Sequence, residues 1–402
     1  QAAPLWLAMD PIPELEELCE ILYYKNFTTM EERNQLYSRA LELTLQDAPR
    51  IYTVDQMSYI ARRAEISVAS DLAQGIGSTH LWPSTLRRGD EIGGTVVMGS
   101  QQVLVEPWNP VDGSNWSFDQ LPIRATFDRG FVSNPYTGNY MPHRIERIEV
   151  YAQEGLPISK SPESDWVTLE FVPEVKVPED AWLYWDGNEQ RMITVGEKYP
   201  EGLTAKVKSV IYYREDLFDT VVWHDGSKYY VGDMLLPWIL DWDRSFEGSD
   251  IYDESAAVNL KAALENARGI RILSLDPFVY EYYFEAWSID AEMNLGDIFA
   301  VFYNYGNAPW HTLALGVLAE KAGELAFSSS KAAELDVEWL GYNTGPSLPI
   351  LAKWLDYAIE NNYLPWADFL RDYVSEEEIA ERYANAKKWY QEKGHLWIGN
   401  GP

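Results

Sequence analysis

Cysteine and histidine are scarce in this sequence of 402 residues, which has one cysteine and five histidines. The single Cys19 cannot form a disulfide within the chain, and it cannot supply a metal site built from several thiolates. The histidines stand far apart, and neither an HExxH nor a CxxC pattern occurs. We therefore expect no disulfide framework and no metal site.

Positive charge is also scarce, because 32 lysines and arginines stand against 63 aspartates and glutamates, which gives a net charge of −31. Binding to nucleic-acid phosphates needs a clustered excess of basic residues, so the composition excludes nucleic acid as the main partner. An anionic membrane surface would repel the protein for the same reason. No apolar run reaches the roughly 20 residues that a membrane helix requires, so we expect no membrane insertion.

Local motifs of catalysis are missing as well. There is no GxSxG nucleophile motif, no GxxxxGK[ST] phosphate-binding loop and no GxGxxG dinucleotide motif. The 63 acidic residues always include close pairs, so a pair of catalytic carboxylates for glycoside hydrolysis stays open. On balance the sequence predicts a protein without catalytic residues and without a cofactor.

Aromatic residues are abundant, with 17 tryptophans, 26 tyrosines and 13 phenylalanines. Many lie in polar or turn-rich stretches, as Trp108 and Trp116 do in EPWNPVDGSNW and as Trp310 does. We expect most of these rings to pack in cores. Flat apolar faces beside hydrogen-bonding groups also suit a cleft for sugars or peptides, so the excess favours a protein that binds a large organic ligand.

Periodicity predicts both helices and strands along the chain. Helices are expected at 14–25, at 30–46 after a cap at Thr28 or Thr29, within 230–265, and at 313–325, 348–361, 366–373 and 376–392. Strands are expected at 51–54 and 65–68, in two pieces of 95–105, and at 145–151, 166–171, 207–213, 270–275 and 279–283. Strands and helices without strict alternation indicate an α/β or α+β fold, and the length allows about two to three domains.

The stretch Tyr213–Asp233 (YREDLFDTVVWHDGSKYYVGD) resembles the signature region of family 5 extracellular solute-binding proteins, the peptide/nickel-type receptors of ABC importers. In that family an apolar strand leads into a turn of this type and then into a helix that begins at an acidic residue. Here Trp223, His224, Asp225 and Gly226 fill the turn, and Asp233 fills the helix start. The Asp-Gly tip suits a tight turn and Asp233 suits a helix cap, so the motif is architectural and His224 is not assigned to ligand.

Further matches follow in the family's order at 243–252, at 269–278 (GIRILSLDPF) and at 394–402 (GHLWIGNGP), whose last residues normally lead into another strand. The stretch 31–52 resembles a helix that usually lies far C-terminal to the turn, whereas here it lies upstream. The resemblance covers most of 205–402 and part of 28–55, and it is loose over 95–200. It therefore implies a segment of a longer, elaborated chain.

The resemblance implies an α/β fold of the two-lobed periplasmic-binding-protein type (class II, family 5), with mixed sheets and a helix-rich C-terminal part. Three regions are expected: a helical N-terminal segment at 1–92, a mixed α/β lobe at 93–270 and a helix-rich lobe at 271–402. The implied function is that of an extracellular, cell-surface or periplasmic receptor that captures oligopeptides. Such a receptor delivers its ligand to an ABC permease in the membrane, and a separate ATPase powers transport. No signal sequence is visible from Gln1 onward.

Four residues are candidate ligand contacts. The resemblance places a cleft-facing tyrosine in the stretch 249–252, which makes Tyr252 the first candidate. Trp108, Trp116 and Trp310 are the others, chosen for their polar surroundings. Packing in the core or in loops is the competing interpretation for all four.

Three alternative functions stay open. An oligosaccharide receptor of the same family would use the aromatic rings for stacking, whereas nickel is disfavoured because histidine is scarce. A polysaccharide hydrolase would need two carboxyls about 5–10 Å apart in a cleft, with acids such as Asp186 or Asp225. A cell-surface structural protein would fit the N-glycosylation sequons at Asn26 and Asn115.

Overall fold

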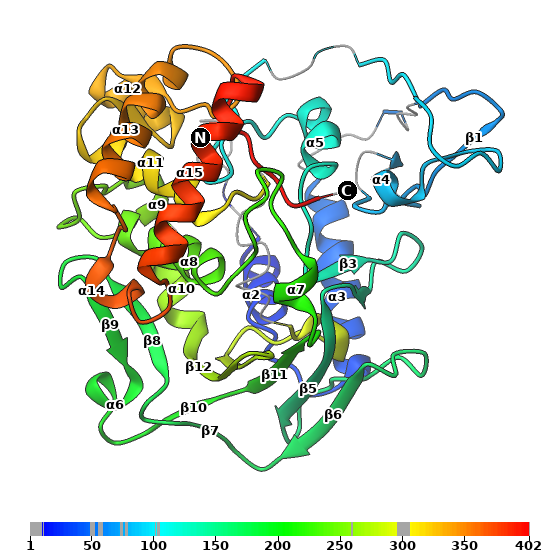
Figure 1. Cartoon of the computed structure of the whole chain (residues 1–402). Helices are drawn as coiled ribbons and strands as arrows, with labels where there is room; N and C mark the ends of the chain where they lie inside the picture. The colour runs from blue at the N-terminus through cyan, green and yellow to red at the C-terminus, as the bar shows by residue number, and fades with distance from the viewer. Residues whose placement is uncertain are drawn as a thin grey trace.

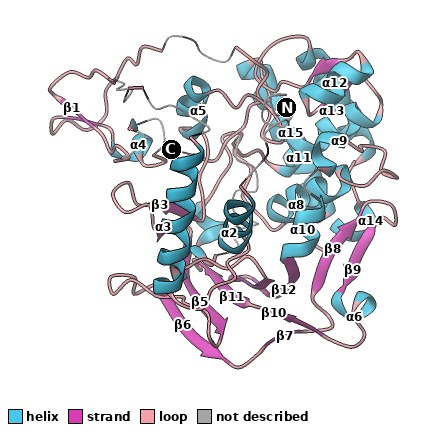
Figure 2. Cartoon of the chain, turned by 180° about the vertical axis from the view of Figure 1, so that it is seen from behind, coloured by secondary structure: helices cyan, strands magenta, loops and turns pink. Residues whose placement is uncertain are grey.

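The computed structural model describes residues 10, 12–48, 53–54, 59–72, 75–76, 79–100, 102, 105–258, 260–295 and 306–401. A mixed β-sheet lies on one side of the molecule (Figure 1). Most of the longer helices belong to the chain beyond residue 230, and they gather beside this sheet. An N-terminal helical hairpin lies on the opposite side of the molecule from the viewer of Figure 1, so Figure 2 shows it in front. The chain is a mixed α/β protein with a helix-rich C-terminal part, as the sequence predicted.

The sheet has seven strands in the order β6-β5-β11-β13-β12-β8-β9. Their bounds are β5 Ile145–Gln153, β6 Val167–Val172, β8 Trp182–Asp186, β9 Arg191–Thr194, β11 Val207–Tyr213, β12 Ala267–Leu275 and β13 Phe278–Phe284. β5 and β6 run parallel, and the other neighbouring pairs are antiparallel. Alternation explains these strands: in β5, Ile148, Val150 and Ala152 are buried and the side chains between them are more exposed.

The helix-rich part is built around two buried helices. The longer helices there are α8 Gly232–Arg244, α11 Trp310–Lys321, α13 Ser347–Asn361 and α15 Glu376–Lys393. Nearly all side chains of α8 and α11 are buried, so these helices have no polar face, whereas α13 and α15 pack one apolar face against them. α15 begins at the predicted cap, because the Ser375 hydroxyl accepts a hydrogen bond from the Glu378 backbone N–H.

Short elements connect and flank these layers. The short helices are α4 Trp82–Thr85, α5 Ser117–Arg124, α6 Val195–Lys198, α7 Leu217–Thr220, α9 Glu254–Ala257, α10 Leu260–Asn266, η2 Ala291–Met293, α12 Ser329–Leu335 and α14 Ala367–Leu370. The two-stranded ladders pair β1 Ile66–Ser67 with β2 Arg87–Arg88, β3 Phe131–Ser133 with β4 Tyr140–Pro142, β7 Val175–Val177 with β10 Leu203–Ala205, and β14 Leu325–Ala326 with β15 Glu338–Trp339. Of these, α4, α5 and β3 lie near the C-terminal end of the chain (Figure 1).

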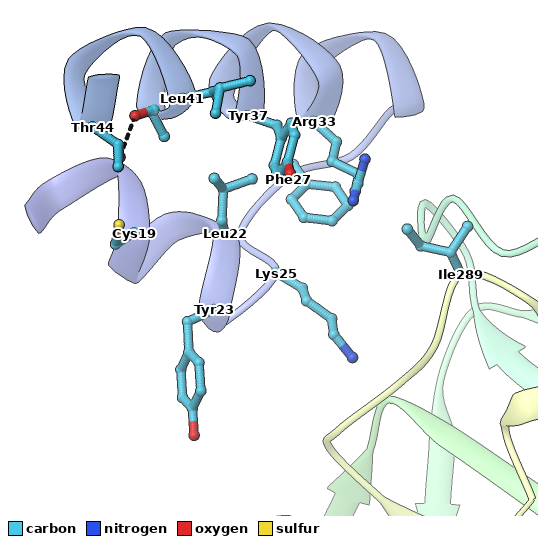
Figure 3. Close-up of a pocket in the computed structure, with 11 residues that line it drawn as sticks. Cys19, Leu22, Tyr23, Lys25, Phe27, Arg33, Tyr37, Leu41, Thr44 and Ile289 are labelled. Carbon is cyan, nitrogen blue, oxygen red and sulfur yellow. Dashed lines mark hydrogen bonds between the residues drawn. The ribbon is translucent and has the colours of Figure 1, made fainter. Parts of the chain in front are cut away.

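The N-terminal hairpin consists of α2 Pro13–Tyr23 and α3 Met30–Asp47. The Thr29 side chain caps α3 by accepting a hydrogen bond from the Glu32 backbone N–H. Phe27, between the helices, packs edge-on against Trp287 of the body with ring centroids 5.6 Å apart, and the Lys25 ammonium donates to the Trp287 carbonyl. The groove of about 510 Å³ at the hairpin, which Ile289 of the body also lines (Figure 3), is therefore part of the seam that joins hairpin and body.

The structure confirms the predicted helices of the hairpin and the predicted strand pair β12–β13, but the two strands predicted within 95–105 are wrong where the chain is described. Residues 95–100 form no strand, and the Val97 side chain is 91% exposed. A strand is stable only with a pairing partner and a buried face, which the described part of this segment lacks. The strand predicted at 51–54 falls partly outside the described residues.

The expected domain boundary and the two glycosylation sequons can also be located in the structure. The expected boundary between residues 270 and 271 falls inside β12, and β13 beyond it belongs to the same sheet as β5 and β11. The asparagines of the two sequons, Asn26 and Asn115, are both exposed. Within the described ranges, no helix combines the length and the apolar composition that crossing a membrane would take.

Candidate functional site

A pocket of about 630 Å³ lies where five sequence-distant segments meet. Its lining comes from 80–84 at the start of α4, 124–132 after α5, 143–144 before β5, 220–226 in the turn after α7, and 400–401 near the C-terminal end. Figures 1 and 2 agree in placing α4, α5, β3 and the C-terminal end in one region of the molecule. The fold, and not any local motif, therefore assembles this pocket.

The pocket lining is rich in cationic and titratable groups. It contains three arginines and three histidines: Arg124, Arg129, Arg144, His80, His143 and His224. Asp128 is the one acidic residue among the described residues that line it. A concentration of arginine in a chain of net charge −31 runs against the charge of the rest of the protein. Such a pocket attracts an anion while the surrounding surface repels one.

Asp128 neutralises one side of the pocket. Its Oδ1 lies 2.6 Å from His143 Nε2, and its Oδ2 accepts a hydrogen bond of 2.6 Å from Arg144 Nε. Burial by itself would raise the pKa of Asp128, but the hydrogen bonds and charges of His143 and Arg144 together hold it below its usual value. Asp128 is therefore ionised at neutral pH, and it compensates the Arg144 guanidinium.

Arg124 lacks this kind of compensation. The residue stands in the last turn of α5, and burial lowers the pKa of its partly buried guanidinium. Its Nη1 is buried with no hydrogen-bond partner, and among the described residues no carboxylate forms an ion pair with it. The helix C-terminus offers a favourable dipole to the charge but no acceptor to this nitrogen. Arg124 thus presents an unmatched donor and an unmatched charge.

Arg129 and His80 lie on the same side of the pocket as Arg124, around the Phe127 ring. The Arg129 guanidinium lies 5.4 Å from the Phe127 ring, and the His80 ring meets the same Phe127 at a centroid distance of 6.0 Å. Burial, and then the charges of Arg129 and Arg124, lower the pKa of His80 to about 3. His80 is therefore neutral at physiological pH, in a positive field produced by the two arginines.

The C-terminal segment closes the pocket beside the Trp223-His224-Asp225-Gly226 turn. The His224 backbone N–H donates to the Gly399 carbonyl at 2.8 Å, and its ring Nε2 lies 3.0 Å from the Gly401 carbonyl oxygen. A Cβ at Gly399 would lie 1.8 Å from the Thr126 carbonyl oxygen, so only glycine permits this approach of the two backbones. His224 therefore holds the segment against the rest of the pocket.

The remaining acids of the turn region make structural contacts, but the prediction that Asp233 caps the following helix is wrong. Val231 holds the cap position of α8 without a side-chain hydrogen bond, and Asp233 lies inside the first turn, where its carboxylate is bound by other groups. The Asp225 carboxylate lies 3.0 Å from His311 Nε2, and both side chains are fully buried. Asp233 accepts hydrogen bonds from Trp223 Nε1, from the Trp310 backbone N–H and from Arg382. These bonds attach the turn to α11 and α15 and hold one wall of the pocket in place.

The four candidate contacts from the sequence lie outside the described pocket lining. Trp108 and Trp310 have no exposed surface: Trp108 stacks on Trp397 at 4.3 Å, and Trp310 Nε1 donates to Glu378. Trp116 is 40% exposed at the start of α5.

Tyr252 is partly exposed, and burial together with neighbouring acids, Glu247 first among them, raises its pKa. Those acids make its surroundings unfavourable for an anionic ligand. The ligand role of the four residues stays a prediction.

The acids considered for hydrolysis have other partners in this structure. Asp225 pairs with His311, and Asp186 accepts hydrogen bonds from the backbone N–H groups of Asn188 and Glu189 in the β8–β9 turn. Among the described residues, no three His, Cys, Asp or Glu side chains come together as a metal site.

Sequence reasoning missed the arginines and His80, although one signal was available. Arg124 and Arg129 stand close together in IRATFDRG, and His143 and Arg144 follow soon after, in a chain where positive charge is scarce. No pattern in those stretches predicts that they meet the 220–226 turn and the C-terminal segment.

No family model matches the chain, and no protein with a curated description is similar enough to it to count as a match.

Proposed function

We propose that this chain is the ligand-binding part of an extracellular solute-binding receptor of an ABC importer, with a two-lobed fold, which captures oligopeptides and delivers them to a membrane permease. The observation that carries the proposal is the cationic pocket in a strongly acidic protein. The turn that resembles the receptor family, through Trp223, His224 and Gly226, forms part of that pocket. Capture requires a shaped and charged cavity, and it requires no catalytic group.

The charge of the pocket favours a peptide over an oligosaccharide. Every peptide with a free C-terminus carries a carboxylate at neutral pH, which pairs well with arginine. A neutral sugar gains little from guanidinium groups and depends instead on exposed aromatic faces. Trp108 and Trp310 are fully buried and present no such face in this structure.

Thermal unfolding with two ligand libraries tests this proposal. Tripeptides to pentapeptides are compared with neutral oligosaccharides, each well above its dissociation constant. A bound peptide at 100 times its dissociation constant adds about 2.7 kcal/mol to the free energy of unfolding. Stabilisation by oligosaccharides alone would favour the sugar receptor, and cleavage of a polysaccharide would overturn the receptor function.

A further inference from the structure

The N-terminal hairpin has an apolar groove that opens to solvent between α2 and α3. The side chains of Tyr23, Tyr37 and Leu41, which line it, are 78%, 52% and 48% exposed. We propose that this groove docks an amphipathic helix of a partner protein, with lysines or arginines along one edge of its apolar face. The groove shares no lining residue with the ligand pocket, and the inference is independent of the proposed function.

The hairpin buries only part of its apolar surface. The buried cluster between its helices consists of Leu18, Ala40 and Leu43. A neighbouring stripe of α3, with Tyr37, Leu41 and Leu45, stays exposed, so no described part of the chain covers it. Single exposed apolar residues are ordinary, but a contiguous stripe of them marks an interaction surface.

The spacing of this stripe suits a helix as the partner element. Tyr37, Leu41 and Leu45 follow each other at intervals of four residues, which forms a ridge beside which a second helix can pack. Leu22 of α2 lines the other side of the groove, whose volume is about 510 Å³. A helix docked there would bury the stripe and turn the hairpin into a three-helix bundle, with apolar anchors at matching intervals.

Glutamates along α2 indicate the charge of the partner. Glu16 stands three residues before Cys19, and Glu20 stands three residues before Tyr23, which places both carboxylates along the α2 edge of the groove. Both side chains are exposed, and among the described residues neither forms an ion pair, whereas two other glutamates of the hairpin pair with Arg39. Basic residues along the facing edge of a docked helix would complement Glu16 and Glu20.

The remaining charges of the hairpin favour this occupant over others. Lys25 and Arg33, the cations of the lining, stand at the end that faces Ile289 (Figure 3), and they already donate to the Trp287 carbonyl and to Asn34 Oδ1. Residues 13–47 contain eight acidic and three basic residues, in a chain of net charge −31. A second copy of the chain would therefore bring like charges together, and an anionic membrane would repel the hairpin.

Cys19 is a native probe for occupancy, because it is the one cysteine of the chain, is exposed and lines the groove. The ligand for the test is a helical peptide of about 18 residues with leucines on one face and lysines along the edge of that face. A scrambled peptide of the same composition keeps the charge but has no apolar face, so it controls for general attraction to an acidic protein. The ordered peptide should bind at least about tenfold more tightly in titration calorimetry and should slow the reaction of Cys19 with N-ethylmaleimide at least about tenfold.

Two pairs of variants separate the apolar from the charged contribution. Leu41→Gln should weaken binding of the ordered peptide at least about tenfold, whereas Leu335→Gln, at a leucine of α12 that is 45% exposed, should not change it. Glu16→Gln combined with Glu20→Gln should weaken binding about tenfold. The matched control is the same double change at positions 377 and 381, two exposed glutamates at equal spacing in α15.

The proposal fails if the ordered and scrambled peptides bind equally, if the ordered peptide leaves Cys19 fully reactive, or if Leu41→Gln has no effect. A dimer in sedimentation analysis that Leu41→Gln dissociates would assign the groove to a second copy. Tighter peptide binding by a chain that starts at Asp10 would assign it to residues 1–9. Either of these results would also overturn the partner helix.

Discussion

Replacing Asp128 by Asn probes the charge balance of the pocket. The carboxylate is 11% exposed and makes two contacts of 2.6 Å, to His143 and to Arg144. Hydrogen bonds to a charged group contribute about 1.5–3 kcal/mol each, and the neutral amide retains part of each bond. We therefore expect Asp128→Asn to lower the free energy of unfolding by roughly 2–4 kcal/mol at pH 7.

The pH dependence of this loss follows from the lowered pKa of Asp128. A carboxyl whose pKa is lower in the folded than in the unfolded state stabilises the protein above the unfolded pKa of about 3.9, and this contribution disappears as the pH falls through the folded pKa. The difference between wild type and Asp128→Asn should thus be widest near neutral pH and narrow below about pH 4. Urea unfolding at several pH values measures it.

The same variant should bind anions more tightly. Removing a unit negative charge about 10 Å from the ligand, at an effective dielectric constant of about 20, changes the binding energy by about 1.7 kcal/mol, which is more than tenfold in affinity. Asp216→Asn is the matched control, because Asp216 pairs with Arg214 at an exposed site and should cost well under 1 kcal/mol. A pH-independent stability difference, or weaker anion binding by Asp128→Asn, would refute the charge assignment.

Three further predictions concern the same region. Gly399→Ala should disrupt ligand binding and lower the melting temperature, since its Cβ would lie 1.8 Å from a backbone oxygen; Gly99→Ala, with open space around it, should do neither. Because the pKa of His80 is lowered to about 3, its contribution to stability is complete above the unfolded value of about 6.5 and is lost as the pH falls toward 3. His80→Gln should therefore flatten the unfolding free energy across that range, and an unchanged slope contradicts the assignment. Asp233→Ala removes the nearer of the two carboxylate partners of the buried Arg382, since Asp233 lies at 2.6 Å and Glu378 at 3.1 Å, and it should cost about 3–5 kcal/mol in chemical denaturation. Asp356→Asn at an exposed ion pair should cost less than about 1 kcal/mol.

Local sequence patterns were sufficient to predict much of the fold. The alternation in β5 and the acidic N-terminus of α15 are local signals, and both elements form where they were expected. β8, which contains Trp182, Tyr184 and Trp185, was not among the predicted strands. In the structure this strand lies in the sheet between β12 and β9, and Trp185 is buried against Asp243. A strand buried on both faces has no alternation to detect.

The site could not be predicted in the same way. Its residues come from segments as distant as His80 and Gly401, and only the packing of α4, α5 and the turn after α7 brings them together. The sequence did identify the turn that contains His224, although it did not assign His224 to a ligand, and in the structure Trp223, His224 and Gly226 line the pocket. It could not show that Nη1 of the partly buried Arg124 has no hydrogen-bond partner among the described residues, because this depends on which acceptors the fold brings within reach.

A crystal structure with a tripeptide bound would test the central claim most directly. The account predicts that the ligand lies in the pocket between α4, α5 and the 220–226 turn. A ligand bound beside Tyr252, outside this pocket, would contradict the account and favour the residues that the sequence alone had suggested.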